Sequence, residues 1–448
     1  MHFNFDMALS RLMDDEYDPF LLRAGGKPEL NCSIPSILEF PNFMRKKSIV
    51  YTVVCVFLSF YLFVMLAIVC DDYLVPAMER LCYSLRMSYD VAGATFLAAS
   101  TSAPELFVAF VGTFITKGDI GIGTIVGSSV FNVLGIAAVC GICTGVTSKL
   151  DWWPITRDTV WYLISILALF YVLFDSAVNV WEAAGLVILY IIYLVVLVFD
   201  RKIQSICRVV DTERDMIDEN PLEREEQPLK SFKETVCGYP EKEDHVCKKI
   251  WWGLKYPAVV LLAITTPSAR SIYFLSMLLA VIWISIISYF VTWFLTVVGY
   301  NIGIPDSIMG LTILAIGTSV PEIVASFIVA KKGYGSMAMC NAIGSNTFDI
   351  FICLGLPWFV AALVFSDTIK VQSSGLLITT GMLVGTALVT YISFLITKFV
   401  LGKVVGWISL ISYILFVAAA IYLEMRLLKK TCDIESAEYA YLNKEAAN

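Results

Sequence analysis

Three acidic residues stand inside long apolar stretches of this 448-residue chain: Glu105, Glu322 and Asp349. Hydrophobic residues make up 58% of the chain and charged residues only 16%, a composition typical of a membrane protein. A carboxylate inside a bilayer costs several kcal/mol unless it is compensated. Each of the three is therefore a candidate for binding a cation.

Two hydroxyl residues precede each glutamate, so that the hydroxyls stand at i and i+1 and the glutamate at i+4. This spacing recurs in two places: Thr101, Ser102 and Glu105, and Thr318, Ser319 and Glu322. On a helix it predicts that each hydroxyl pair projects beside its own carboxylate. Ordinary interhelical hydrogen bonding would also account for the hydroxyls taken alone.

More oxygen donors follow on the next helices and in the backbone. The next apolar stretches offer two i, i+4 pairs: Ser128 with Asn132, and Ser345 with Asp349. Pro104 and Pro321 lack the N–H that would bond the carbonyl four residues earlier, so we expect kinks and free carbonyls at Ser100 and Gly317. In lipid such a carbonyl needs another partner, and a cation suits it.

Carboxylates, hydroxyls, an amide and carbonyls form the ligand set of a hard cation. Ca²⁺ takes about six to eight such oxygens in flexible geometry, and Na⁺ would compete for the same charges. Histidine occurs only at His2 and His245, which excludes a polyhistidine metal site or histidine acid/base chemistry within the membrane. A net charge of −7 argues against a nucleic-acid partner.

The elements that must position these groups are apolar runs long enough to cross a bilayer as helices. We predict ten spans, five on each side of one break: 49–70, 91–115, 120–143, 159–175, 180–199, 272–297, 308–330, 337–364, 374–397 and 404–425.

The break is a charged stretch, 201–255, that reads as a solvated and partly disordered loop. A shorter apolar piece, 251–266, contains Pro257 and begins with two tryptophans. We interpret it as an interfacial segment, with an eleventh spanning helix as the alternative.

The two halves of the chain repeat one another. A shift of 217 residues places Gly93 on Gly310 and Phe131 on Phe348, without a gap. Three dipeptides also coincide under this shift: Thr101-Ser102 with Thr318-Ser319, Pro104-Glu105 with Pro321-Glu322, and Gly127-Ser128 with Gly344-Ser345. So many coincidences at one constant shift indicate that the second half arose by duplication of the first.

Five helices per half is an odd number, so the second copy must enter the membrane upside down. Inverted repeats are a transporter architecture, with the substrate site near the midplane. We therefore predict an all-α polytopic membrane protein with ten transmembrane helices in two inverted five-helix repeats. Its predicted parts are an N-terminal tail (1–48), a first half (49–199, with a repeat at 91–143), a cytoplasmic loop and interfacial segment (200–271), a second half (272–426, with a repeat at 308–364) and a C-terminal tail (427–448).

Orientation follows from the basic residues. With the N-terminus outside, the outer loops between helices carry only Lys117 and Lys370, and the inner segments carry most of the rest. Arg45-Lys46-Lys47 beside the first helix argues for the opposite orientation. The sequon Asn31-Cys32-Ser33 would be glycosylated only in the lumen, so we expect an outside N-terminus and a glycoprotein.

Four segments together resemble the paired repeats of the Ca²⁺/cation antiporters, and most closely the K⁺-dependent Na⁺/Ca²⁺ exchanger family. They are 93–105 (GATFLAASTSAPE), 127–132 (GSSVFN), 310–322 (GLTILAIGTSVPE) and 344–349 (GSNTFD). The resemblance implies that Ca²⁺ and Na⁺ bind at Glu105 and Glu322. The further ligands that it implies are Thr101, Ser102, Thr318, Ser319, Ser128, Asn132, Ser345 and Asp349, with carbonyls at Ala98 and Ala315.

Two positions bear on potassium. Asp349 is similar to the aspartate of K⁺-dependent exchangers, where K⁺-independent animal exchangers have asparagine, so the resemblance implies a K⁺ role for Asp349. Glu322 departs from the aspartate usual in the animal K⁺-dependent family, and its extra methylene moves the carboxylate by about 1.5 Å.

We therefore expect an antiporter, and no enzyme, that exchanges Na⁺ for Ca²⁺ with K⁺ carried alongside Ca²⁺. The alternatives are a Ca²⁺/H⁺ antiporter, since buried glutamates can carry protons, and a K⁺-independent Na⁺/Ca²⁺ antiporter. A membrane hydrolase and a channel are more distant rivals. We expect no cofactor, and only membrane lipids and the transported cations as partners. The expected location is the plasma membrane, with a Golgi-derived or other organelle membrane as the alternative.

Overall fold

The computed structural model describes residues 49–85, 89–116, 120–175, 177–200, 246–267, 272–302, 308, 310–365, 369–370 and 374–446. The sequon at Asn31 and the charged stretch 201–245 lie outside the described residues.

Helices make up nearly all of the described chain, because only a helix satisfies the backbone hydrogen bonds of a single segment in lipid. The first half contains α2 (Ile49–Val69), α3 (Val75–Leu85), α4 (Tyr89–Ala92), α5 (Ala98–Thr101), α6 (Ala103–Val111), α7 (Ile120–Val130), α8 (Ala137–Cys143), α9 (Trp152–Val172) and α10 (Val180–Val198). The second half contains α14 (Val246–Thr265), α15 (Tyr273–Ile302), α17 (Ala315–Thr318), α18 (Val320–Lys331), α19 (Gly335–Phe348), α20 (Gly355–Phe365), α21 (Ser374–Ile396) and α22 (Lys403–Ala446).

Within the described residues, eight helices are long and apolar enough to cross a membrane, and two bent helix pairs raise the number to as many as ten. The bent pairs are Gly93–Thr101 with Ala103–Phe114 and Gly310–Thr318 with Val320–Lys331. Each helix or pair overlaps one of the ten apolar runs in the sequence. The chain is therefore an all-α polytopic membrane protein.

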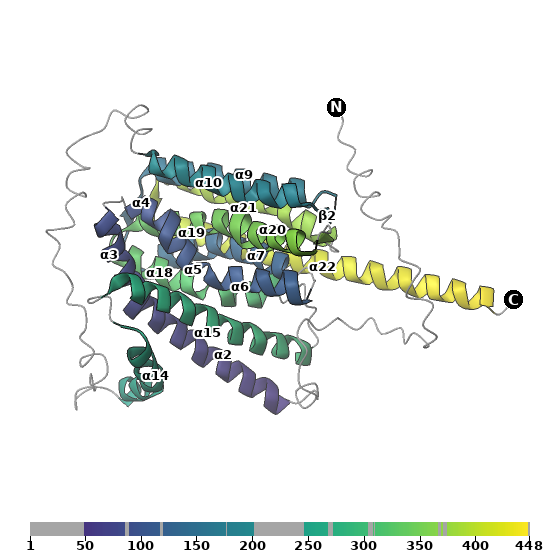
Figure 1. The fold of residues 1–448 in the computed structure, drawn as a ribbon, viewed down its shortest axis with the longest axis horizontal. Coiled ribbons are helices and arrows are strands. Elements are labelled where there is room, and N and C mark those ends of the chain that lie inside the picture. The colour runs from purple at the N-terminus through teal and green to yellow at the C-terminus, as the bar shows by residue number, and fades with distance from the viewer. Residues whose placement is uncertain are drawn as a thin grey trace.

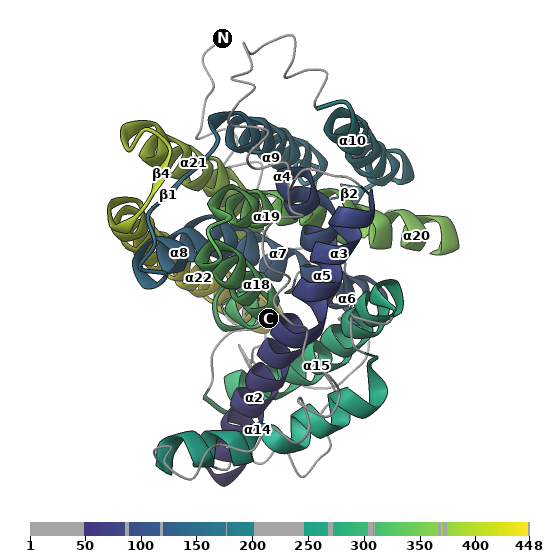
Figure 2. The ribbon, with the colours of Figure 1, turned by 90° about the vertical axis from the view of Figure 1, so that its left-hand side faces the viewer.

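The helices form three layers. The broken helices, α7 and α19 lie in the middle, with α9, α10 and α21 on one side and α2 with α15 on the other (Figures 1 and 2). One large apolar core runs through the middle layer and the α9 side, and a second lies among α2, α14 and α15. The middle helices α7 and α19 are almost wholly buried, so their polar residues face protein rather than lipid.

Two short strand pairs join the halves. Strand β1 (Ser148–Lys149) precedes α9 and pairs with β4 (Val400–Leu401), which follows α21. Strand β2 (Ala177–Val178) follows α9 and pairs with β3 (Ile369–Lys370), which precedes α21. The start of α9 therefore lies beside the end of α21, and the end of α9 lies beside the start of α21. These two helices run in opposite directions.

The halves also share their backbone distortions. A π-helical turn at η3 (Gly93–Leu97) matches η6 (Gly310–Leu314) at the 217-residue shift. A second turn, η5 (Phe131–Ile136), has its counterpart in η7 (Asp349–Leu354). Such turns are rare and are frequent at functional sites. Two further π-helical turns, η2 (Cys70–Leu74) and η4 (Gly112–Thr116), occur in the first half.

Two glycines let the halves approach closely. A Cβ at Gly127 would collide with the carbonyl oxygen of Leu311, and a Cβ at Gly344 would lie 2.8 Å from the Cα of Ala94. The 217-residue shift takes Gly127 to Gly344 and Ala94 to Leu311, so these are two copies of one contact. Each glycine therefore seats its helix against the π-helical turn of the other half.

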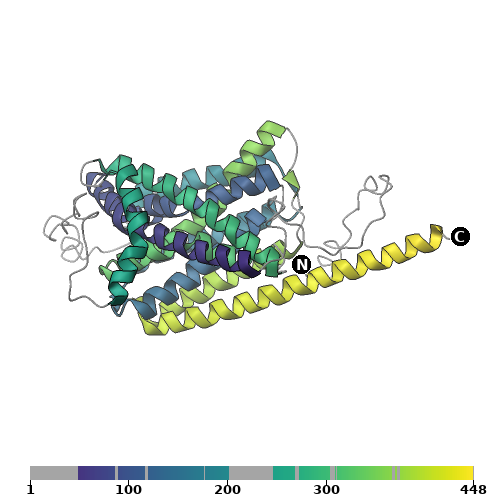
Figure 3. The same cartoon turned by 90° about the horizontal axis from the view of Figure 1, so that it is seen from below.

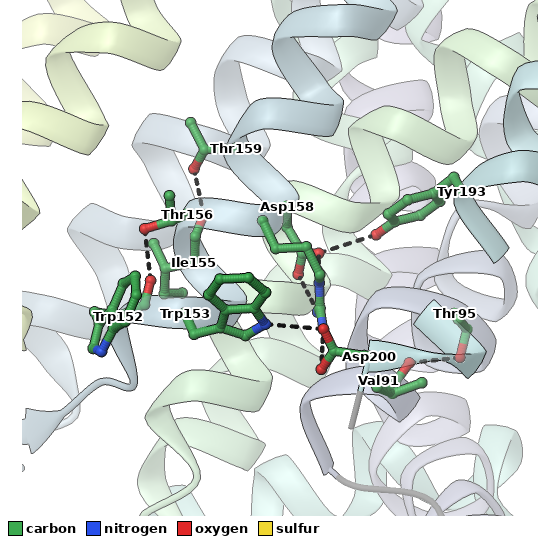
Figure 4. Close-up of polar contacts among 11 residues, drawn as sticks. Val91, Thr95, Trp152, Trp153, Ile155, Thr156, Asp158, Thr159, Tyr193 and Asp200 are labelled. Atoms are coloured by element: carbon green, nitrogen blue, oxygen red, sulfur yellow. Dashed lines mark hydrogen bonds and ion pairs between the residues drawn. The ribbon is translucent and has the colours of Figure 1, made fainter. Parts of the chain in front are cut away.

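A buried ion-pair cluster ties the start of α9 to the end of α10 (Figure 4). The guanidinium of Arg157 contacts the carboxylates of Asp158, at 2.7 Å, and Asp200, at 3.0 Å. The Tyr193 hydroxyl donates to Asp158 and the Trp153 indole N–H donates to Asp200. These donors offset the one negative charge that remains, which is what a buried ion pair requires.

Helix α14 lies outside the three layers, and α22 lies only partly outside them, since its apolar part packs against α8 and α21. Helix α14 packs against α2 and runs across the direction of α2 and α15 (Figure 3), with Pro257 inside it. Helix α22 has 44 residues and continues well past the bundle (Figures 1 and 3). Its apolar part ends at Arg426.

The close contact at Gly344 can be tested with one methyl group. We expect Gly344→Ala to destabilise the protein by roughly 1–3 kcal/mol, because the new Cβ meets Ala94 backbone that cannot move aside. Thermal unfolding of the purified protein in one detergent measures the effect. The control is Gly385→Ala in α21, where a Cβ meets nothing within 4 Å. Equal unfolding temperatures for the two variants would contradict the contact.

Candidate functional site

The candidate site lies where the two broken helices meet. Between α5 and α6 the backbone leaves the helical conformation at Ser102 (φ −82°, ψ 11°), and between α17 and α18 it does so at Ser319 (φ −82°, ψ 9°). The bends are 51° and 50°. Pro104 and Pro321 then fall in the first turn of the new helix, where a missing N–H costs nothing.

Each glutamate stands in the first turn after a break. Glu105 belongs to the first turn of α6 and Glu322 to that of α18. The unpaired N–H groups of a helix start carry a partial positive charge that favours a nearby carboxylate. The break therefore supplies part of the compensation that a buried carboxylate needs.

The serines at the breaks reach across to the other half. Ser102 Oγ donates to Glu322 Oε1 at 3.1 Å, and Ser319 Oγ donates to Glu105 Oε1 at 3.4 Å. The sequence spacing had predicted each hydroxyl beside the carboxylate of its own helix, and for the serines that prediction is wrong. Because the helix is broken at the serine itself, the i, i+4 geometry no longer applies there.

The threonine hydroxyls and the alanine carbonyls make hydrogen bonds within their own segments, and Thr318 also lies within hydrogen-bonding reach of Glu105 in the other half. Thr101 Oγ1 donates to the carbonyls of Leu97, at 3.0 Å, and Ala98, at 3.2 Å, while Thr318 Oγ1 donates to Ala315 O at 3.3 Å. The carbonyls of Ala98 and Ala315 also accept the backbone N–H of Ser102 and Ser319. A carbonyl oxygen has two lone pairs, so these bonds leave room for a further contact.

The next helices bring amide and hydroxyl groups to the same region. Asn132 Nδ2 donates to Ser345 Oγ at 3.4 Å and to Asn346 Oδ1 at 3.3 Å. Ser128 and Ser345 each donate to a carbonyl three residues earlier in their own helix. Asn132 is the second residue of η5 and Asp349 the first of η7, so both side chains lie in the first turn of a π-helical segment.

Several oxygens of the candidate site are buried and have no hydrogen-bond partner. They are Glu105 Oε2, Glu322 Oε2, Asp349 Oδ2 and Asn132 Oδ1. The three carboxyl groups are also close enough to repel one another. Buried carboxylates without partners are costly, so this arrangement favours a ligand that brings positive charge.

The acidic residues alone do not form a metal cage. Within the part of the chain that the structure describes, no three His, Cys, Asp or Glu side chains converge on one metal position. A bound cation would therefore also take neutral oxygens, which the site has in its hydroxyls, amide and carbonyls. Such a mixed, all-oxygen donor set suits Ca²⁺, Na⁺ or K⁺ and not a transition metal.

Cys353 is a neighbour of the site that sequence reasoning missed. Its Sγ lies 3.5 Å from Asp349 Oδ1 and 3.8 Å from the carbonyl oxygen of Ser102. The thiol thus bridges η7 and the break in the first half. Its i+4 position after Asp349 is the signal in the sequence that places the two side chains on one face.

Comparison with known proteins points to one family. The family model described as "Sodium/calcium exchanger protein" matches residues 55–199 and 272–422. Sodium/potassium/calcium exchanger 5 of Homo sapiens is 36% identical, with 88% of each chain covered. Sodium/potassium/calcium exchanger 3 of Homo sapiens is 31% identical, with 90% of this chain and 86% of the relative covered. A solved structure of the sodium-calcium exchanger NCX_Mj has a TM-score of 0.53 at 22% identity, with 83% of this chain and 99% of that one covered, and so shares the fold.

The crossed serine–glutamate bonds predict a specific pattern of energetic coupling. In double-mutant cycles that combine Ser102→Ala with Glu322→Gln, and Ser319→Ala with Glu105→Gln, we expect coupling of about 0.5–3 kcal/mol, because each pair shares a buried hydrogen bond. Thermal unfolding in the absence of Ca²⁺ gives the four stabilities of each cycle. The control cycle pairs Ser102→Ala with Glu105→Gln. Stronger coupling in that cycle than in the crossed ones would show that each serine serves its own helix.

Proposed function

Because this chain belongs to the sodium/calcium exchanger family, we propose that it is a secondary active antiporter that exchanges Na⁺ for Ca²⁺ at the site between its broken helices. The observation that carries the proposal is the pair of crossed bonds, Ser102 to Glu322 and Ser319 to Glu105, each of which leaves one carboxylate oxygen free. Ca²⁺ and Na⁺ would bind through these free oxygens together with the neutral donors around them.

The architecture we infer is ten transmembrane helices in two inverted five-helix repeats, 49–199 and 272–426, with the site near the midplane. The opposite directions of α9 and α21 support the inversion, since these helices occupy the same place in their halves. Matched bends and matched π-helical turns support the repeat. Sites at the interface of such repeats serve alternating access, in which one side opens at a time.

Exchange rather than leak follows from the charge of the site. Moving three uncompensated carboxylates through a layer of low polarity is costly, so an empty site does not reorient. A site loaded with Ca²⁺, or with several Na⁺ ions in its place, carries compensated charge and can reorient. Each net charge that crosses 100 mV changes the free energy by about 2.3 kcal/mol, so the membrane potential can help to drive Ca²⁺ out.

Asp349 is the residue on which a role for K⁺ depends. Its Oδ2 is buried without a partner, and its charge adds to those of Glu105 and Glu322. A third negative charge can retain a monovalent ion beside Ca²⁺, and relatives of this chain are named sodium/potassium/calcium exchangers. We therefore propose that K⁺ travels with Ca²⁺ and that its charge is balanced by Asp349.

A Ca²⁺/H⁺ antiporter is the second candidate, because the unpartnered carboxylate oxygens could each hold a proton. Ca²⁺ flux that survives full replacement of Na⁺ but collapses with the pH gradient would select it. A K⁺-independent Na⁺/Ca²⁺ antiporter is the third candidate, because Glu322 is longer than the aspartate usual at that position in the animal K⁺-dependent family. We also propose that the protein lies in the plasma membrane with its N-terminus outside.

Neutralising either glutamate tests the site. Glu105→Gln and Glu322→Gln keep the shape and one acceptor oxygen of the side chain but remove its charge. We expect Na⁺-dependent ⁴⁵Ca²⁺ uptake into proteoliposomes to fall at least about tenfold in each variant, because charge compensation of the cation is lost. The control is Asp175→Asn, an exposed carboxylate at the end of α9, which should leave uptake unchanged. Full uptake in either glutamine variant would rule out this site.

The role of Asp349 is tested by its potassium dependence. In Asp349→Asn we expect ⁴⁵Ca²⁺ uptake that no longer responds when K⁺ is replaced by choline, because the extra negative charge is gone. Uptake by the unmodified protein should fall in the same exchange. Asp175→Asn again serves as the control and should keep its K⁺ response. A K⁺ response in Asp349→Asn equal to that of the unmodified protein counts against the assignment.

A further inference from the structure

A second polar cluster lies one helical turn from the candidate site. Asn341 on α19 donates from Nδ2 to Ser326 Oγ on α18 at 2.8 Å, and Ser326 Oγ donates to the carbonyl oxygen of Ala338 at 3.4 Å. Both side chains are fully buried. We call Ser326, Asn341 and the Ala338 carbonyl the outer cluster.

The outer cluster has an unused acceptor. Asn341 Oδ1 is buried and has no hydrogen-bond partner. An amide oxygen left in this state costs free energy unless something else contacts it. Packing of α18 against α19 accounts for the Ser326 contact. It does not explain a buried amide whose oxygen accepts no hydrogen bond.

The outer cluster continues the rows of site residues on both helices. Ser326 follows Glu322 by four residues on α18, and Asn341 precedes Ser345 by four on α19. Four residues of helix rise by about 6 Å, so these pairs lie one above the other on the same face. Beyond the outer cluster α18 ends at Lys331 and α19 begins at Gly335. The cluster therefore lies between the site and the turn that joins α18 to α19.

The hydroxyl of Ser326 and the amide of Asn341 have no identical counterpart in the first half. The 217-residue shift takes Ser326 to Ala109 and Asn341 to Thr124, so the first half has a buried methyl group in place of the hydroxyl and no amide. Thr101, Ser102, Glu105 and Ser128, by contrast, each have an identical residue at the equivalent place in the second half. Thr124 is itself buried and polar, so the halves differ here in the donors they offer: one hydroxyl in the first half, and an amide with a hydroxyl in the second.

We propose that the outer cluster is an additional cation position, occupied by Na⁺ as it passes between the main site and the end of the bundle at the α18–α19 turn. Its donors, Asn341 Oδ1, Ser326 Oγ and Ala338 O, are neutral oxygens. Neutral oxygens suit a monovalent hard cation that keeps part of its hydration, whereas Ca²⁺ needs carboxylates to replace its water. The proposal rests on the proposed exchange function.

Exchange currents in excised membrane patches test it, because they allow Na⁺ to be varied on one face at a time. In Asn341→Ala we expect the half-activating Na⁺ concentration to rise about three- to tenfold on the face of the α18–α19 turn, and to stay unchanged on the other face. Asn341→Asp, which adds a carboxylate, should lower it on that same face. The matched control is Thr124→Ala, at the equivalent place in the first half, which should shift neither face.

The outcomes separate the two proposals. If the unmodified protein gives no current that depends on both Na⁺ and Ca²⁺, the proposed function fails. If it gives that current but Asn341→Ala shifts both faces alike, or neither face, the outer cluster only packs α18 against α19 and the inference is overturned. Ser326→Ala covers the case in which Asn341→Ala does not fold, and it should move the same face in the same direction.

Discussion

Two carboxylates buried away from water impose the constraint on which the rest of the structure depends. Glu105 and Glu322 have no accessible surface, so the charge of each must be compensated by groups inside the protein. The breaks in the two central helices provide helix starts beside both groups, and the serines at the breaks occupy one oxygen of each. The other oxygen of each glutamate has no partner, so compensation within the protein is incomplete, and in the proposed function a cation supplies the rest.

Neither half of the chain satisfies this constraint alone. The serine that serves each glutamate comes from the other half, and so does the backbone against which each helix glycine packs, as at Gly127 and Gly344. Pairs of equivalent contacts are the expected result when two copies of one unit face each other about a two-fold axis. Two positions depart from that equivalence: Asp349 corresponds to Asn132 in the first half, and Asn341 corresponds to Thr124.

Much of this could be read from the sequence, and what could not has identifiable causes. Apolar length gave the helices, and charge in apolar surroundings gave Glu105, Glu322 and Asp349, because both signals are local. The crossed bond from Ser102 to Glu322 was out of reach, since it depends on a backbone break that helical spacing does not encode. The start of α9 was placed too late because Arg157 and Asp158 resemble loop residues until Asp200, far along the chain, is seen to complete their ion pair.

The crossed bonds also have a consequence for biosynthesis. Ser319 follows Glu105 by 214 residues, so the first broken helix leaves the ribosome long before the hydroxyl that serves its carboxylate exists. At about 5–20 residues per second the interval is about 10 to 40 s. Throughout that interval the carboxylate of Glu105 lacks the Ser319 hydroxyl that donates to it in the finished protein, so the first half cannot complete its own share of the candidate site.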